Sequence, residues 1–285
     1  MAERPLEGKV AIITGAGSPI GIGHAITLGL ARAGARVVLT DINQEWLAQT
    51  VGEVREICGD DCAIGIASDV TDPQACQNAV DTTITQMGGL NILVNNAGTN
   101  PRVAGLGTVS GATPTNFWEN SPEAWSHVVA VNLSGNFYMA RAAVVHMLNQ
   151  GWGRIIGVTT SMDTMWRKGG APYGPSKAGH EALVAIMAQE LEGTGVTANI
   201  LVPGGATYTN MTYSGDPKLK DRLIHPEAMQ KPAVWLASDD SGGFNGRRII
   251  AYNWDDSLPL AERLEECSAP AAWPQLGQQA IRLNR

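Results

Sequence analysis

Tyr173 and Lys177 are the two residues whose types and spacing could most directly move a proton. They lie four positions apart, in a stretch that we predict to be the first turn of a long helix ending near Glu192. Residues four apart share one face of a helix. Tyrosine titrates near pH ~10, and a nearby ammonium group favours the phenolate, so such a pair could act as a general acid and base. Alone, the spacing is common enough by chance to carry little weight.

The composition is that of an ordinary globular protein. The chain has 285 residues, of which 44% are hydrophobic and 16% charged, enough to bury a sizeable core. The net charge of -7, without a basic block, argues against nucleic acid or an anionic membrane as the partner. No apolar run approaches the ~20 residues of a membrane span, and the first residues lack a signal-peptide core. We therefore expect a cytoplasmic protein.

The four cysteines are Cys58, Cys62, Cys76 and Cys267. Cys58 and Cys62 could meet on a helix, but no cluster of histidine and cysteine completes a metal site. We predict four free thiols in a reducing compartment, and no bound metal.

A glycine-rich loop follows the first apolar run. Residues 9–14 predict a buried strand, Gly15 to Gly23 form the loop, and residues 24–33 predict a helix. Glycines allow the backbone to approach a pyrophosphate, and the helix N-terminus offers free N–H groups and the positive end of its dipole. Strand, glycine loop and helix together are typical of the start of a dinucleotide-binding domain.

Strands and helices alternate through most of the chain. Further strands are expected at residues 36–41, 62–67, 90–95, 153–159, 195–202 and 246–252, separated by helices at 43–58, 73–87, 122–150, 173–192 and 226–238. Such alternation requires a parallel sheet with helices on both faces. We predict an α/β, Rossmann-type, doubly wound fold with a seven-stranded parallel sheet. Residues 1–285 would form one domain with an atypical C-terminal extension at 253–285.

Asp41 ends the second of these strands, 18 residues beyond Gly23. That is about where a carboxylate that binds a ribose 2′-hydroxyl belongs, although the residue could equally cap the following helix. No arginine follows Asp41 directly. The position therefore favours NAD over NADP as the cofactor.

Together these residues resemble the short-chain dehydrogenase/reductase family, over roughly residues 6–252. The motifs that carry the resemblance occur in the family's order: Thr14-Gly15 with Gly21-Ile22-Gly23, Asp41, Asp69-Val70, Asn95-Asn96-Ala97-Gly98, Asn132, Tyr173 with Lys177, and Pro203-Gly204. The resemblance implies hydride transfer between a nicotinamide cofactor and a secondary alcohol or ketone. The expected cofactor-binding residues are Gly15, Ser18, Ile20, Gly21, Ile22, Asp41, Asp69, Val70, Asn96, Ala97, Gly98, Tyr173, Lys177, Pro203 and Gly204.

The resemblance also assigns catalytic roles. Tyr173 would give or take the hydroxyl proton, Lys177 would hold the nicotinamide ribose and keep Tyr173 acidic, and Asn132 would break its helix to anchor a water relay. The family is usually tetrameric, which implies a homotetramer that acts on a small-molecule alcohol or carbonyl substrate.

The third catalytic hydroxyl is either Ser161 or Thr160. The family places a serine after the fifth strand, usually thirteen residues before the tyrosine, which corresponds to Thr160, whereas Ser161 is twelve before it. Side chains alternate along a strand, so only one of the two can face the cofactor. The residue type favours Ser161 slightly, because a loop easily absorbs one residue.

Three departures from the family pattern bear on function. The glycine loop is longer by two residues, as if Pro19 and Ile20 were inserted, and the loop from Gly98 to Asn132 is longer than usual. Its polar stretch at 99–116 is either a lid or an unstructured insertion. The tail lacks the family's usual ending and either covers a site or packs as a terminal helix. Two alternatives therefore stay open: a catalytically silent NAD-binding regulatory protein, or an epimerase that uses bound NAD.

The substrate clues are thin. The segment 162–168, Trp118 and the loop 207–216 could border the substrate pocket. Asp163, Arg167 and Lys168 could bind a polar or anionic substrate or lie in solvent, and Met162, Met165 and Trp166 could line a pocket for a ring compound or belong to the core.

Overall fold

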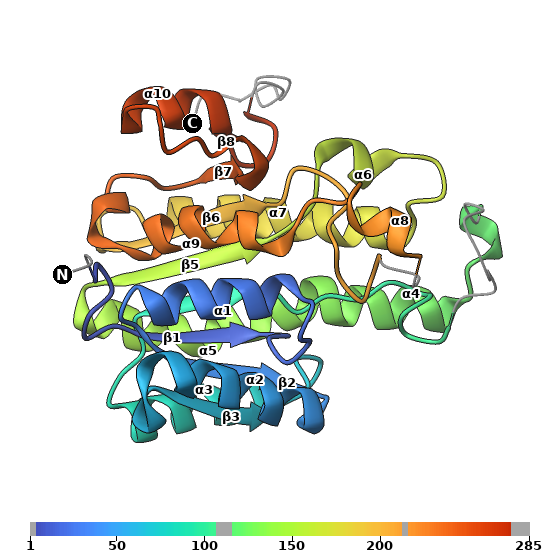
Figure 1. Ribbon diagram of the computed structural model, residues 1–285. Helices are drawn as coiled ribbons and strands as arrows, with labels where there is room; N and C mark the ends of the chain where they lie inside the picture. Colours follow the sequence, from blue (N-terminus) through green and yellow to red (C-terminus); the bar gives the residue numbers. More distant parts are fainter. Residues whose placement is uncertain (1–3, 107–115, 213–215, 275–285) are drawn as a thin grey trace, which may run out of the picture.

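A single mixed sheet forms the centre of the computed structural model, which describes residues 4–106, 116–212 and 216–274. The strand order is β3-β2-β1-β4-β5-β6-β7-β8 (Figure 1). The strands are β1 (Val10–Thr14), β2 (Arg36–Asp41), β3 (Ala63–Ala67), β4 (Ile92–Asn95), β5 (Gly153–Val158), β6 (Val196–Val202), β7 (Arg247–Ile250) and β8 (Ser268–Pro270). β1 to β7 are parallel, which confirms the predicted Rossmann-type fold.

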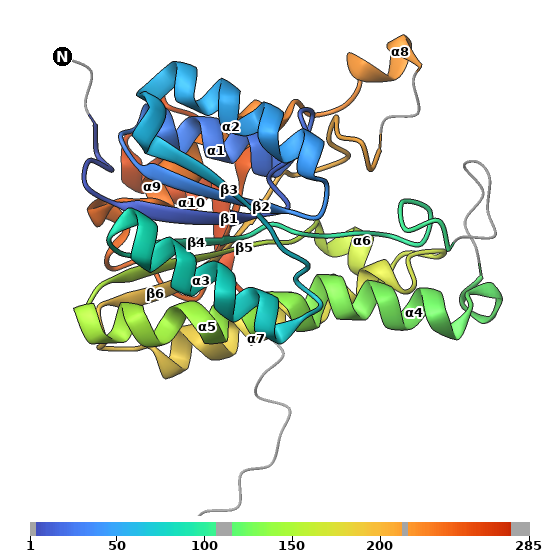
Figure 2. The ribbon, with the colours of Figure 1, turned by 90° about the horizontal axis from the view of Figure 1, so that it is seen from below.

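Helices cover both faces of the sheet, as Figure 2 shows. One face carries α1 (Ile22–Arg32), α2 (Gln44–Cys58) and α9 (Gln230–Ala237), and the other carries α3 (Pro73–Met87), α5 (Gly135–Gln150) and α7 (Tyr173–Glu190). Shorter helices lie in the connections: α4 (Pro122–Val129), α6 (Met162–Trp166), α8 (Pro217–Lys220) and α10 (Leu260–Cys267). Single turns complete the elements: η1 (Asp60–Cys62), η2 (Phe117–Glu119), η3 (Ala130–Ser134), η4 (Pro226–Met229), η5 (Asp239–Ser241) and η6 (Ala251–Asn253).

The central strands are buried along their whole length. Every residue of β1, β4, β5 and β6 is buried, as expected for parallel strands with helices on both faces. Ile26 and Leu30 of α1 pack into the core on one side, and Met139 and Met147 of α5 pack into the core on the other.

The sheet has one strand more than the sequence predicts. The C-terminal segment turns back after α10 and adds β8 antiparallel to β7, with Ala269 opposite Arg248. Three residues that end in Pro270 carry too weak a pattern to be read as a strand. The extension therefore joins the same sheet, where β8 pairs with the outer edge of β7 (Figure 1).

The predicted helix at 122–150 is continuous but changes its winding. α4 ends at Val129, the π-helical η3 spans Ala130–Ser134, and α5 follows directly. Asn132 lies in the wide turn, which agrees with the expectation that it interrupts regular helix. The whole stretch is long and apolar enough, by length and composition, to cross a membrane. Because it packs on α3 and β5, we read it as a helix of the core.

The prediction of four free thiols is wrong for one pair. Cys58 ends α2, Gly59 turns the chain with a φ of 95°, and η1 brings Cys62 back. Cys58 and Cys62 form a disulfide with their Cα atoms 5.8 Å apart. The turn after the helix, and not the helix itself, brings the two sulfurs together. Cys76 and Cys267 are free and buried.

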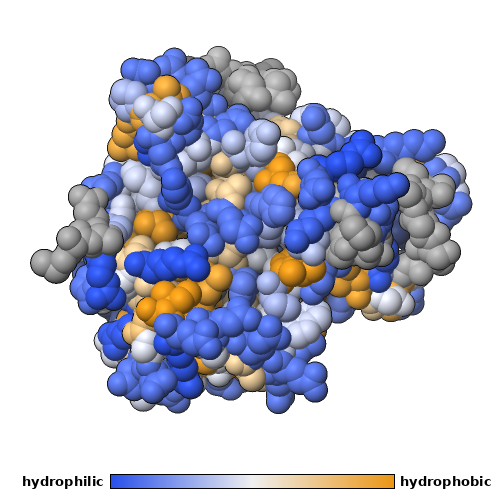
Figure 3. Space-filling view, viewed as in Figure 1, coloured by the Kyte–Doolittle hydropathy of each residue, from blue (hydrophilic) through white to orange (hydrophobic). Residues whose placement is uncertain are grey.

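The surface is polar in character on the side shown in Figure 3. Hydrophobic residues show there as separate orange patches between larger blue areas. This agrees with an acidic chain of which 16% of the residues are charged.

Candidate active site

A cleft of about 950 Å³ lies at the carboxyl ends of the parallel strands. Ligands bind at this edge in open α/β sheets, where the strand order reverses between β1 and β4. Fourteen of the predicted site residues line it: Gly15, Ser18, Gly21, Ile22, Asp41, Asp69, Val70, Asn96, Ala97, Gly98, Thr160, Tyr173, Lys177 and Pro203. Ile20, Gly204, Asn132 and Ser161 were also predicted but do not line it.

Thr14 ties the ends of β1 and β4 together beside this reversal. Its hydroxyl oxygen accepts hydrogen bonds from the backbone N–H groups of Asn96 and Ala97, at 3.0 and 2.9 Å. The Asn96 side chain donates in return to the carbonyl oxygens of Thr14 and Gly15. These bonds hold the loop after β4 against the glycine loop after β1.

The glycine loop fits an anionic group. Gly15 has a φ of 63°, and a Cβ there would lie 2.8 Å from the Cα atom of Ala97, so only glycine allows this approach. Gly21 caps α1 without a side-chain hydrogen bond, and the first turn of α1 has no acidic residue. The N-terminal N–H groups of α1 are therefore available for a phosphate.

The two inserted residues lie in a turn beside the cleft. The turn is closed by a bond from the N–H of Gly21 to the carbonyl of Ser18, 3.0 Å long, and it contains Pro19 and Ile20. Ser18 and Gly21 face the cleft, whereas Ile20 does not. The Ser18 hydroxyl accepts from Asn210 of the 207–216 loop, at 2.9 Å, so this loop joins the glycine loop across the cleft.

Asp41 lies at the end of β2 and lines the cleft. Its Oδ2 atom accepts from the N–H of Gly17 and its Oδ1 atom from the N–H of Asn43, both at 2.9 Å. Each carboxylate oxygen has two acceptor positions, so one on each remains for a ligand hydroxyl. The alternative that Asp41 caps the following helix is wrong, because Asn43 is the N-cap of α2. The role of a carboxylate that binds a ribose hydroxyl is compatible with this arrangement.

The geometry favours Thr160 over Ser161 as the third hydroxyl. Thr160 and Tyr173 both line the cleft, and the Thr160 side chain acts to lower the pKa of Tyr173. Ser161 precedes α6, and its hydroxyl pairs with that of Thr164 at 2.8 Å. The position of Ser161 in the structure therefore does not support the slight preference that its residue type gave it. β5 ends at Val158, and the extended chain beyond it brings Ser161 to the start of α6.

Lys177 lies at the floor of the cleft with Asn132 beneath it. Lys177 Nζ donates to the carbonyl of Val158 at 2.9 Å, and a Cβ on Gly98 would lie 3.3 Å from that nitrogen. Asn132 is fully buried; it accepts from the N–H of Thr99 and donates to the Thr99 carbonyl and the Ser176 hydroxyl. Asn132 therefore acts on the cleft by holding the loop after β4.

Burial controls the protonation of both α7 side chains. It raises the pKa of Tyr173, although the Thr160 hydrogen bond and the charge of Arg167 act to lower it. It lowers the pKa of Lys177 to about 8. Arg167 is the cation that lowers the pKa of Tyr173 in this structure, and desolvation outweighs it. The effect of Lys177 on Tyr173 stays a prediction.

The sequence predicted only some of the residues that line the remaining wall of the cleft. Arg167 and the 207–216 loop border it as expected, through Thr207, Thr209 and Thr212 among others. Trp118, Asp163 and Lys168 do not line the cleft, nor do Met162, Met165 and Trp166. Thr164 of the predicted segment 162–168 also lines it, whereas sequence reasoning missed Thr99, Asn100, Arg102, Asn120 and His127. The predicted loop at 99–116 supplied a signal only for Thr99, Asn100 and Arg102; its residues 107–115 are outside the described structure.

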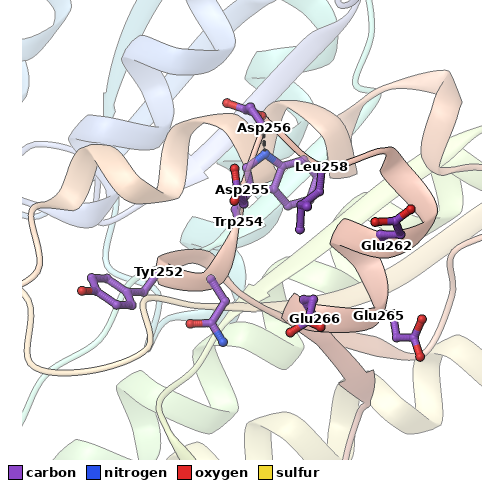
Figure 4. A pocket seen from close by; sticks show the side chains of 9 residues that line it. Tyr252, Trp254, Asp255, Asp256, Leu258, Glu262, Glu265 and Glu266 are labelled. Carbon is purple, nitrogen blue, oxygen red and sulfur yellow. Dashed lines mark hydrogen bonds between the residues drawn. The ribbon is translucent and has the colours of Figure 1, made fainter.

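A second hollow, of about 670 Å³, lies on the C-terminal extension (Figure 4). Carboxylates of Asp255, Asp256 and α10 surround it, and the Trp254 indole donates to Asp256 at 2.8 Å. Within residues 4–106, 116–212 and 216–274, no group of three or more metal-binding side chains has the geometry to hold an ion. The hollow brings together none of the predicted catalytic groups.

Residues 9–219 match the short chain dehydrogenase family. This chain belongs to that family. It is 33% identical over 255 residues to the 2,5-dichloro-2,5-cyclohexadiene-1,4-diol dehydrogenase of Sphingobium indicum, covering 86% of this chain and 95% of the relative. It is 32% identical over 267 residues to an NADPH-dependent aldehyde reductase-like chloroplastic protein of Arabidopsis thaliana, covering 87% and 94%.

Among solved structures, a candidate gluconate dehydrogenase of Agrobacterium tumefaciens superimposes with a TM-score of 0.74 at 29% identity. The match covers 88% of this chain and 96% of that one. Members of the short chain dehydrogenase family are oxidoreductases that use a nicotinamide cofactor on small molecules, and the Rossmann-type cleft fits such a cofactor. The relatives differ in substrate, so family membership fixes the reaction class and not the substrate.

We expect Lys177→Met to stabilise the protein without cofactor at neutral pH. The folded state binds fewer protons than the unfolded state between the lowered pKa of about 8 and the ordinary value of 10.5, so wild-type stability rises with pH in that window. Below pH 8 the buried ammonium costs about 3 kcal/mol, and Met removes this cost but loses one hydrogen bond of about 1 kcal/mol. Urea unfolding at pH 7 should show a gain of about 2 kcal/mol that shrinks towards pH 10.

The matched control is Lys168→Met, whose side chain is exposed and should give no pH-dependent gain. An equal gain for Lys177→Met at pH 7 and pH 10 would contradict the assignment of the cost to the buried charge.

Proposed function

We propose that this protein is an NAD-dependent dehydrogenase/reductase that interconverts a secondary alcohol and the corresponding ketone. The observation that carries the proposal is that Thr160 and Tyr173 line the same cleft, with Lys177 one helical turn further along α7. Asp41 lies in the same cleft at the end of β2. The arrangement offers a proton donor, an oxygen-binding hydroxyl and a carboxylate for a ribose.

Each residue has a role that follows from its position. The N-terminus of α1 and the glycine loop would hold the pyrophosphate of a nicotinamide cofactor, Asp41 would accept from a ribose hydroxyl, and Lys177 would bind the second ribose. When bound, the cofactor would supply the hydride acceptor for alcohol oxidation and the hydride donor for ketone reduction. Tyr173 accepts the hydroxyl proton during oxidation and donates it during reduction. Thr160 donates a hydrogen bond to the substrate oxygen as charge gathers on it.

The raised pKa of Tyr173 keeps the phenol protonated at neutral pH. A protonated phenol is the form that donates to a ketone oxygen. Arg167, at the rim of the cleft, lowers this pKa and so favours the phenolate that alcohol oxidation requires.

A homotetramer is the assembly we propose, because the outer faces of three helices expose large apolar side chains. They are Trp125 of α4, Phe137, Val145 and Leu148 of α5, and Ile186 of α7. Apolar patches of this kind favour association between copies. Light scattering of the purified protein would give four times the 30.1 kDa chain mass, and a monomer would refute the proposal.

Purified protein should be screened with NAD against polyols, sugar alcohols, hydroxy acids and ring alcohols, followed at the NADH absorbance band. Turnover with any of these supports the proposed reaction. Cofactor binding without any absorbance change would favour the silent regulatory protein. Conversion of a substrate without net NADH would favour the epimerase.

Tyr173→Phe should lose nearly all turnover while it still binds the cofactor. The change removes one hydroxyl and leaves the ring, and general acid/base groups contribute roughly 10²–10⁴-fold. kcat and the cofactor Kd should be measured together. A Phe variant that retains wild-type kcat would remove Tyr173 from the mechanism.

Thr160→Val and Ser161→Ala should differ in their effect. Loss of a hydroxyl that binds the reacting oxygen lowers kcat by roughly 10²-fold or more, and we expect this for Thr160→Val. Ser161→Ala should stay near wild type, since its hydroxyl pairs with Thr164. The reverse result would transfer the role to Ser161.

The kcat/KM with NAD should exceed that with NADP, because Asp41 repels a 2′-phosphate. Asp41→Asn keeps an oxygen for the Gly17 or Asn43 N–H but removes the charge, so the preference should fall by about 10-fold or more, roughly 1.4 kcal/mol. Asp72→Asn is the control, since its carboxylate accepts from the Gln74 N–H at the start of α3 and does not line the cleft. Equal use of both cofactors by the wild type would show that Asp41 does not select.

A further inference from the structure

Glu181 is a buried acid with no part in the proposed reaction. It lies on α7 four residues after Lys177 and eight after Tyr173, so the three side chains share one face of the helix. Its exposed fraction is 0%, and it does not line the cleft. A carboxylate is rarely buried so completely without a partner that compensates its lost hydration.

Three groups contact the Glu181 carboxylate. The Thr159 hydroxyl donates to Oε2 at 3.1 Å, Arg248 Nη1 lies 3.6 Å from Oε1, and the N–H of Ala272 donates to Oε1 at 3.3 Å. Burial raises the pKa of Glu181, and Arg248 and the hydrogen bonds act to lower it. The partners come from the end of β5, from β7 and from the C-terminal extension.

Arg248 connects this carboxylate to the residue that meets Tyr173. It lies on β7 with an exposed fraction of 6%, and its Nη2 atom donates to the Thr160 carbonyl at 3.0 Å. Glu181 therefore holds the Thr159 side chain while Arg248 holds the Thr160 backbone. Both contacts act on Thr159 and Thr160, the two residues that follow β5. These residues lie outside any helix or strand, and their one backbone hydrogen bond of that kind runs from the Thr159 N–H to the Leu201 carbonyl.

The C-terminal extension encloses the pair from behind. β8 places Ala269 opposite Arg248, and the next residues lead directly to the Ala272 contact with Glu181. Trp273 then donates its indole N–H to the sulfur of Met162, at 3.2 Å, two residues after Thr160. None of residues 253–274 lines the cleft, so this described part of the extension acts on the site through these contacts.

We propose that Glu181 and Arg248, enclosed by the C-terminal extension, are positioning residues that fix the Thr159-Thr160 segment so that the Thr160 hydroxyl meets Tyr173. The proposal rests on the proposed function for the role of Thr160. A buried ion pair costs desolvation free energy that well-packed apolar residues would not, so its contribution here is orientation rather than stability. Displacement of a reacting group by about 1 Å can cost 10²-fold in rate.

Three variants separate orientation from stability: Glu181→Gln, Arg248→Met, and the two changes combined. Each single change leaves a charge or polar group without its partner and should lower the urea midpoint. The double variant buries no charge and should recover the midpoint towards wild type. Its kcat should stay roughly 10- to 100-fold below wild type with the cofactor KM unchanged, because the Thr160 carbonyl still lacks its donor.

The matched control is Arg247→Met, the adjacent residue on β7, whose guanidinium donates to Ser268 at 2.9 Å and has no contact with Thr160. Its kcat should equal that of the wild type. If the single variants fail to fold, the double variant carries the test alone. A double variant with wild-type kcat would overturn the proposal.

A second measurement keeps this inference distinct from the proposed function. In a Thr160→Val background the double change should lower kcat no further, because the hydroxyl it positions is already absent. Further loss in that background would show that the pair acts by another route and would also overturn the proposal. Wild-type kcat in Thr160→Val alone would instead refute the role of Thr160 in the proposed function.

Discussion

Parallel pairing of β1 to β7 is the constraint on which the rest of this structure depends. It places every strand's carboxyl end at one edge, and the sheet order reverses between β1 and β4. The connection after β1 enters α1 on one face, and the connection after β4 leads to α4 and α5 on the other. The two connections diverge, and the cleft opens between them. The Thr14 hydroxyl holds the ends of both strands at this point, so the glycine loop and the loop with Gly98 keep a fixed separation.

The site and its surroundings contain charged side chains whose burial is energetically unfavourable. Lys177, Glu181 and Arg248 have exposed fractions of 3%, 0% and 6%, and burial is the largest cause of the pKa shifts of Lys177 and Glu181. Such groups lower stability unless each finds a partner. Here Lys177 donates to the carbonyl of Val158, Arg248 donates to the carbonyl of Thr160, and Glu181 accepts from the Thr159 hydroxyl. Burial of these groups therefore lowers the stability of the folded state, while their hydrogen bonds fix the position of the residues that surround Tyr173.

The fold could be predicted because its signals are local. Apolar runs of four to seven residues, glycines after the first strand and helical periodicity placed the seven parallel strands in order, with ends within a few residues. β8 was missed because three residues in a Pro-rich stretch have no pattern of their own and become a strand only against β7. The Cys58–Cys62 disulfide was missed because helical spacing suggested one geometry, whereas Gly59 and η1 create another.

By itself, the sequence determined that Tyr173 and Lys177 share a helical face, that Asp41 ends a strand, and that a glycine loop precedes α1, because each of these follows from spacing along one element. Only the tertiary structure shows that Thr160 lines the cleft and Ser161 does not, since this depends on where the chain enters α6 after β5. Only it joined Glu181, Arg248 and Ala272, which lie 67 and 24 residues apart along the chain. Contacts at that separation depend on how the sheet brings β5, α7, β7 and the extension together, and no local spacing encodes them.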